Sequence, residues 1–103
     1  MAKTAYLYDE RFTAHDTGMG HPERPTRVVT IHEKVRNNKL YSQLIKVRPR
    51  KATKANIGLI HAPHYPVRVK YQIDHNIHYL EAMDTPVGKE SYETAMLATG
   101  SCL

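Results

Sequence analysis

The chain has 103 residues, which limits it to one small domain, and a domain of this size buries only a modest fraction of its surface. Lys and Arg outnumber Asp and Glu by 15 to 10, and the formal charge of +5 allows an anionic partner without indicating a fold. The single cysteine excludes an internal disulfide, and no apolar segment is long enough for a signal peptide or a membrane span. We therefore expect a cytoplasmic protein with no membrane contact.

The first half of the sequence alternates strand and helix patterns. Residues 4–8, TAYLY, predict a first strand. After a turn-rich stretch, apolar residues recur at helical spacing from Pro25 to about residue 37. Residues 44–49, LIKVRP, predict a second strand that ends at its proline.

The second half is predicted to be helical. Thr53 is suited to cap a short helix over residues 54–61. A longer helix begins at Pro63, with apolar residues at steps of four up to Ile77. Residues 90–103 predict a last helix.

For three small residues of the last helix, the sequence allows more specific predictions. Ser91 fits the N-cap position, two residues before an acidic side chain. Gly100 has the residue type of a helix C-terminus. Cys102 lies in an apolar stretch with no basic neighbour, so we expect a small core residue and not a nucleophile.

The order strand, helix, strand, helix predicts an α/β layered fold, whose parallel sheet must be covered on both faces. Two short strands do not complete such a sheet, so we expect the front piece of a larger domain. The apolar face of the last helix, near Met96 and Leu97, then lacks a partner. We expect it to promote self-association or association with the remainder of the domain.

Four histidines form two HxxH pairs, His61 with His64 and His75 with His78. On one continuous helix, three of them would share a stripe, and imidazoles three residues apart can share a zinc ion. No cysteine ligand set or HExxH motif accompanies them, and Pro63 interrupts the first pair. The pattern favours a polar helix face, with His61 bonded to nearby backbone.

The segment KVRPRKATK, residues 46–54, contains five basic residues, as a nucleic-acid footprint would. It has no interleaved aromatic residue for base stacking and matches no recognised binding motif. The sequence favours a solvated connection between a strand and a helix, and nucleic acid is not the expected partner.

Residues 15–27, HDTGMGHPERPTR, are the most unusual stretch of the chain. Gly18 and Gly20 supply backbone freedom, and Asp16 and Glu23 are able to bond loop amides. His15 or His21 beside Asp16 has the residue types for acid–base catalysis, but proximity in sequence is not geometry. The residues by themselves predict a structural loop that leads into a helix.

Together with two later segments, this stretch resembles a known family. YDERFTAHDTGMGHPERPTR is similar to the opening of zinc-dependent deacetylases of the histone deacetylase family, especially its bacterial, class II-like and acetylpolyamine amidohydrolase-like branch. The segments IGLIHAPHYPVRVK and DTPVGKESYETAMLATGSCL are similar to two later family segments, in the family's order. The resemblance covers essentially the whole chain.

The resemblance implies that residues 1–103 are the N-terminal part of a single deacetylase domain. That domain has the arginase–deacetylase type of three-layer α/β fold, with a parallel sheet between helices. The implied parent enzyme uses zinc to remove acetyl groups from acetyl-lysine or acetylpolyamines. The family's zinc ligands and paired catalytic histidines have no counterpart here, so the resemblance assigns no catalytic or metal-binding residue. It predicts a chain that is inactive and free of zinc when alone.

The resemblance assigns other roles residue by residue. The first active-site loop, which shapes one wall of the acyl-lysine tunnel, is matched by His21, Pro22, Glu23, Arg24 and Pro25. Arg27 matches an arginine at the floor of the site, beside a channel for acetate. Asp84 falls near a rim aspartate that holds the substrate backbone in some members. The alternative interpretation is a free-standing, non-catalytic basic module that binds another protein or a nucleic acid.

Overall fold

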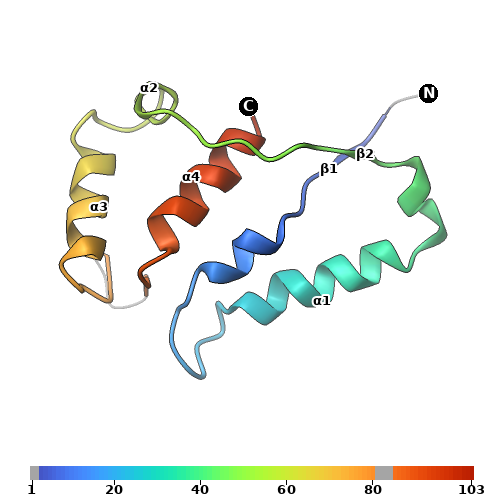
Figure 1. Cartoon of the computed structure of the whole chain (residues 1–103), viewed down its shortest axis with the longest axis horizontal. Coiled ribbons are helices and arrows are strands. Elements are labelled where there is room, and N and C mark those ends of the chain that lie inside the picture. Colours follow the sequence, from blue (N-terminus) through green and yellow to red (C-terminus); the bar gives the residue numbers. More distant parts are fainter. Residues whose placement is uncertain (1–2, 81–84) are drawn as a thin grey trace.

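The structure of the chain is a computed structural model that describes residues 3–80 and 85–103. Short strands alternate with helices in its first half, and helices form its second half (Figure 1). The elements in chain order are β1 (Ala5–Tyr6), η1 (Glu10–Ala14), α1 (Pro25–Arg36), η2 (Lys39–Gln43), β2 (Ile45–Lys46), α2 (Lys54–Ile57), α3 (Tyr65–Asp74) and α4 (Ser91–Ser101), where η denotes a 3-10 helix.

The two predicted strands pair in parallel, and α1 lies in the crossover between them. Ala5 stands opposite Ile45, and Tyr6 opposite Lys46. The amide of Ile45 donates to the carbonyl of residue 4 at 3.0 Å. Each strand is shorter than predicted, because within the described residues pairing is limited to these two positions.

An aromatic cluster joins β1 to α1. The ring of His32 stacks on Tyr6 and Tyr8, with ring centroids 5.8 and 3.8 Å apart. The hydroxyl of Tyr6 lies 2.8 Å from Nδ1 of His32, and burial raises the pKa of Tyr6. Tyr41 and Phe12 meet these tyrosines edge-on. These ring contacts hold the chain at and just after β1 against α1.

The predicted cap of α2 is confirmed. Oγ1 of Thr53 accepts from the amide of Asn56, and the Asn56 side chain accepts from the amide of Thr53. The helix is shorter than residues 54–61, since Gly58 already serves as its C-cap.

The predicted continuation of α3 to Ile77 is wrong. The helix ends at Asp74, His75 is its C-cap, and Asn76 turns the chain with a φ of 61°. Asparagine tolerates this left-handed conformation better than most residues. The histidine stripe that a continuous helix would give therefore does not form, because His78 lies beyond the turn.

The predictions for the small residues of α4 are wrong. Glu90 is the N-cap, so Ser91 is the first helical residue. Gly100 lies within the helix and is buried against residues 50–52 instead of ending it. Cys102 follows the helix and is exposed, so it is not a core residue.

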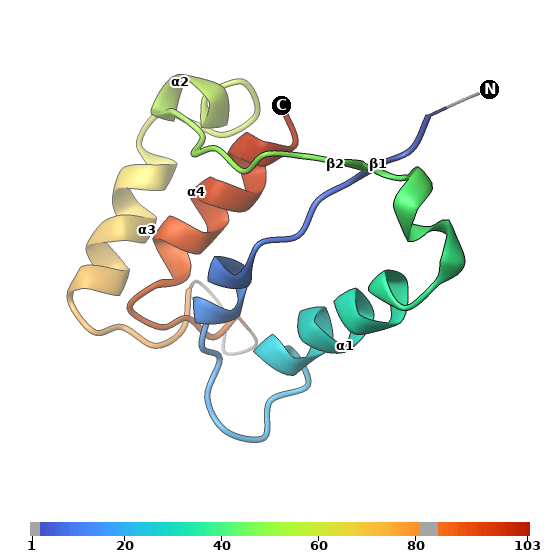
Figure 2. The same ribbon diagram turned by 45° about the vertical axis from the view of Figure 1, so that its right-hand side comes forward.

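The buried apolar core is small and sits where residue 52, α3, residue 87 and α4 meet. Its members are Ala52, Ile73, Val87 and Leu97, and no described side chain is completely buried. The helices lie beside one another when turned by 45° as well, with α4 between α3 and β1–η1 (Figure 2). No helix within the described part of the chain is long and apolar enough to cross a membrane.

Candidate functional site: the loop before α1

The base of the loop at residues 15–27 is held by the start of α4. Nδ1 of His15 lies 2.6 Å from Oγ of Ser91, which is buried. The same hydroxyl oxygen accepts a hydrogen bond from the amide of Gly88 at 2.8 Å. We call these three residues the loop clasp. It joins positions 76 residues apart in the sequence, and no local pattern signals it.

The clasp is tightly packed as well as hydrogen bonded. A Cβ built on Gly88 would lie 2.9 Å from the carbonyl oxygen of Asp16. The absence of a side chain at this position lets the loop backbone approach the segment before α4. Beyond the clasp, Oδ1 of Asp16 accepts from the amide of Gly18 at 2.9 Å, as predicted for that carboxylate.

A second set of bonds closes the loop across its width. Thr17 is buried, and its hydroxyl donates to the carbonyl of Glu23. The backbone amide of Glu23 lies 3.0 Å from Nδ1 of His21 and donates to it. Residues 21–23 therefore have a defined backbone, although they lie near the surface.

The tip of the loop projects away from this base. Gly18 and Gly20 have φ angles of 90° and 80°, in the region that favours glycine, and nothing surrounds the place of a side chain at either residue. Met19 between them is completely exposed. The prediction that the glycines supply backbone freedom is confirmed.

The loop enters α1 as the two prolines require. Arg24 is the N-cap in an extended conformation, with a φ of −155°, and Pro25 is the first helical residue. The guanidinium of Arg27 pairs with the carboxylate of Glu23, one turn away, and both side chains are at least half exposed. The role of Arg27 beside an acetate channel stays a prediction.

Asp84 lies outside the described residues. On either side of the undescribed stretch, Tyr79 pairs antiparallel with Pro86, and the amide of Val87 donates to the carbonyl of His78 at 2.7 Å. A cavity of about 670 Å³ lies between these segments and the loop base, and Asp16, Thr17 and Gly88 line it.

The histidines of the HxxH pairs have neighbours that do not suggest a metal site. His61 stacks on Tyr65, where the sequence predicted a bond to backbone, and His75 stacks on Tyr71. Nδ1 of His75 lies 2.8 Å from the carbonyl of Tyr71. Within residues 3–80 and 85–103, no three His, Cys, Asp or Glu side chains converge where a metal ion could be held. The described donor set therefore does not fit a zinc centre.

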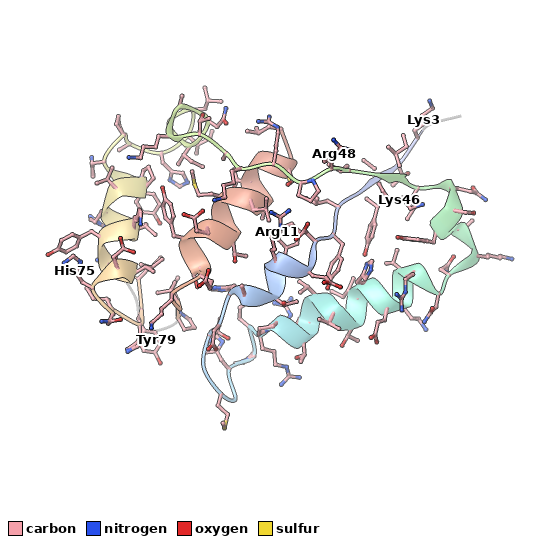
Figure 3. The ribbon with its side chains drawn as sticks, in the orientation of Figure 1. Lys3, Arg11, Lys46, Arg48, His75 and Tyr79 are labelled. Carbon is pink, nitrogen blue, oxygen red and sulfur yellow. The ribbon has the colours of Figure 1, made fainter. Side chains whose placement is uncertain are left out.

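The basic segment at residues 46–54 runs from β2 past the C-terminal end of α4 to the start of α2 (Figure 1). Its labelled residues Lys46 and Arg48 lie far from His75 (Figure 3). Two of its three lysines have structural contacts. Lys46 donates to the carbonyls of residues 41 and 44, and Lys51 pairs with Glu93 of α4. These contacts agree with the predicted solvated connection between strand and helix.

Comparisons with known proteins agree on one family. A family model described as "Histone deacetylase domain" matches residues 21–103. The chain is 28% identical to type-1 histone deacetylase 1 of Dictyostelium discoideum and to histone deacetylase clr6 of Schizosaccharomyces pombe, and 31% identical to histone deacetylase HDAC1 of Drosophila melanogaster. The alignments cover 95% to 98% of this chain but only 20% to 27% of those relatives.

The structural comparison concerns the fold. The crystal structure of the HDA15 HD domain matches 99% of this chain with a TM-score of 0.83, at 24% sequence identity. The match covers 30% of that chain. The predicted arginase–deacetylase type of α/β fold is confirmed, with this chain spanning part of it.

Proposed function

The chain belongs to the histone deacetylase family, and we propose that it supplies the N-terminal part of a zinc-dependent deacetylase domain. Its substrates would be acetylated amines, either acetyl-lysine side chains or acetylpolyamines. The observation that carries the proposal is the clasped loop, since the family match begins at His21, inside a loop with a defined backbone. The complete deacetylase, its substrate preference and its cytoplasmic location are parts of the same proposal.

In this proposal the loop forms one wall of the tunnel that receives the acetylated side chain. A tunnel wall must keep its shape while a flexible alkyl chain enters, because correct positioning of the substrate lowers the barrier to reaction. The two prolines and the clasp at His15 and Ser91 restrict the loop in this way. The imidazole of His21 and the ring of Pro22 would offer the acyl chain apolar surface.

A bound zinc ion would polarise the acetyl carbonyl and activate the attacking water. Because the described residues do not converge on a metal, its ligands belong to other parts of the proposed domain. We assign this chain the binding and orientation of substrate, with Asp84 at the rim and Arg27 near the acetate exit as proposed contacts.

The test is acetate release by the complete gene product that carries these residues. An acetyl-lysine peptide and an acetylated polyamine are offered separately, before and after zinc is removed with a chelator and restored. We expect hydrolysis of at least one substrate, loss of activity with the chelator, and recovery with zinc. A zinc-loaded, folded product that releases no acetate from either substrate would contradict the proposal.

A pair of variants then tests the loop. His21→Ala in the complete product should lower kcat/KM about tenfold, because an open wall no longer positions the acyl chain. Lys34→Ala, an exposed change on α1, is the control and should leave the kinetics unchanged. Equal kinetics for both variants would show that the loop does not contact the substrate.

A further inference from the structure

The net positive charge of the protein is concentrated in one part of the chain. Residues 33–54 contain eight Lys and Arg residues and one acidic residue, whereas the rest of the chain contains seven basic and nine acidic residues. All eight basic residues of this part are exposed. We call them the basic rim, which consists of Lys34, Arg36, Lys39, Lys46, Arg48, Arg50, Lys51 and Lys54. A positive field concentrated in this way attracts an anionic partner.

The charge of the rim keeps it at the surface of any larger domain that this chain helps to form. Lys and Arg are almost never fully buried unless they are paired with an acid. Among the described residues, one ion pair involves the rim, and it joins Lys51 to Glu93. An element packed over the rim would have to supply an acid for each other cation or leave that cation buried and unpaired, which is strongly destabilising. The exposure of the rim therefore does not depend on which further elements pack against α4.

The connection between β2 and α2 presents part of the rim on an extended backbone (Figure 1). Arg48 and Arg50 are exposed, whereas Val47 and Pro49 between them and β2 are partly buried. This alternation is typical of an extended chain, in which successive side chains point to opposite sides. Lys46 continues the exposed series toward β2, so that three cations follow one another at intervals of about 6.6 Å.

The inner side of this connection is fixed by backbone hydrogen bonds. The amide of Val47 donates to the carbonyl of residue 6 at 2.9 Å. The amide of Arg50 donates to Oγ of Ser101 at 3.0 Å, and the amide of Ala52 donates to a carbonyl of α4 at 2.8 Å. Because the backbone is already held in place, a partner does not have to order it, and the entropic cost of binding is reduced.

Arg48 and Arg50 are the most available cations of the connection. Lys51 pairs with Glu93, and Nζ of Lys46 donates to the carbonyls of residues 41 and 44. Among the described residues, neither guanidinium has a hydrogen-bond or ion-pair partner. A guanidinium binds a carboxylate through two parallel hydrogen bonds. The two arginines are therefore suited to hold carboxylates.

We propose that the basic rim binds an extended acidic segment of another protein, with carboxylates at alternate positions facing Lys46, Arg48 and Arg50. Alternate side chains of an extended peptide share one side at the same interval of about 6.6 Å, so the two chains match in spacing as well as in charge. Single-stranded nucleic acid fits less well, because residues 46–54 contain no aromatic side chain for base stacking. A duplex also fits less well, since its phosphates follow a helical path and the connection is extended.

The test is fluorescence anisotropy with the complete gene product and a labelled peptide of about ten residues in which Glu and Thr alternate. We expect binding at about 50 mM salt that weakens about tenfold at about 300 mM, because salt screens exposed charges. Arg48→Gln combined with Arg50→Gln should weaken binding about tenfold at low salt, through loss of the charge-assisted hydrogen bonds. The measurement requires neither zinc nor an acetyl group, so its outcome is independent of the proposed deacetylase activity.

The matched control combines Lys70→Gln with Lys89→Gln, which removes two positive charges at exposed positions outside the rim. It should bind the peptide like the native protein, which separates the rim from the net charge. A peptide of the same composition with all its Glu residues adjacent should bind about threefold more weakly, because its carboxylates no longer share one side. Absence of binding at low salt, equal affinities of the rim variant and the control, equal affinities for the two peptides, or tighter binding of a short DNA duplex would each overturn the proposal.

Discussion

Two pairs of glycines distinguish the two best-defined regions of the molecule. In the loop before α1, Gly18 and Gly20 are needed for their positive φ angles, and space around them is open. At the contacts of α4, Gly88 and Gly100 are needed because backbone lies where a side chain would be. The same residue type therefore serves conformation in one region and close packing in the other.

The two regions differ in how much stability a substitution of glycine is expected to remove. At an open, left-handed position, a side chain strains only its own backbone. At a crowded position, it must displace a neighbouring segment, and protein interiors yield little. Near α4 that neighbour is residues 50–52, where the amide of Ala52 donates to the carbonyl of Met96 at 2.8 Å.

The largest loss of stability is expected for Gly100→Ala. Its Cβ would overlap the backbone of Arg50 and Ala52, so the connection must separate from α4. We expect the free energy of unfolding to fall by about 3 kcal/mol, at the upper end of overpacking effects. Urea denaturation measures it, with Gly58→Ala as control, because a Cβ there meets its nearest atom at an ordinary 3.4 Å. Equal stability of both variants would contradict the close packing.

A smaller effect is expected for Ser91→Ala, which breaks the loop clasp where the two regions meet. The substitution leaves Nδ1 of His15 and the amide of Gly88 without their buried partner. Loss of such partners costs about 1–3 kcal/mol. Hydrogen exchange should also show faster exchange at residues 15–18. Ser42→Ala, an exposed change in η2, is the control, and identical exchange in the two variants would argue against the clasp.

Gly18→Ala tests the open region itself. The φ of 90° strains alanine, and the loss of stability should be about 1 kcal/mol, less than at Gly100. Gly18→Asn should lose less, because asparagine tolerates positive φ. Denaturation measures both variants, and Met19→Ala at the exposed tip should be neutral. A loss as large as that of Gly100→Ala would remove the distinction between the two regions.

The smallest loss of stability is expected for Asp9→Asn, at the N-cap of η1. This short helix packs against both α1 and α4. Hydrogen bonds from the side chain and the backbone amide of Arg11 lower the pKa of Asp9. The stabilisation from a lowered pKa is present above the unfolded value of about 4 and is lost as the pH falls through the folded value. Asp9→Asn should therefore be less stable than the native chain at pH 7, and the difference should shrink below pH 4. Thermal unfolding across pH measures this, and a constant difference would exclude the pairing.

Several helix starts and caps of the chain could be predicted from the local sequence. Pro25 and the helical spacing after it predicted the start of α1, and Thr53 predicted the cap of α2, because each depends on neighbouring backbone. The parallel pairing of β1 and β2 also followed from the order of elements. The three segments that resemble the histone deacetylase family, in the family's order, indicated the family, which the family match confirms.

What only the tertiary structure decided depends on contacts between distant residues. Ser91 reads as a helix cap from its neighbours, but its hydroxyl bonds His15, a residue that no local pattern connects to it. Gly100 reads as the end of a helix, yet residues 50–52 cross it there and make it an interior position. Local propensity describes the backbone of a few consecutive residues, whereas these roles arise when separate segments pack against each other.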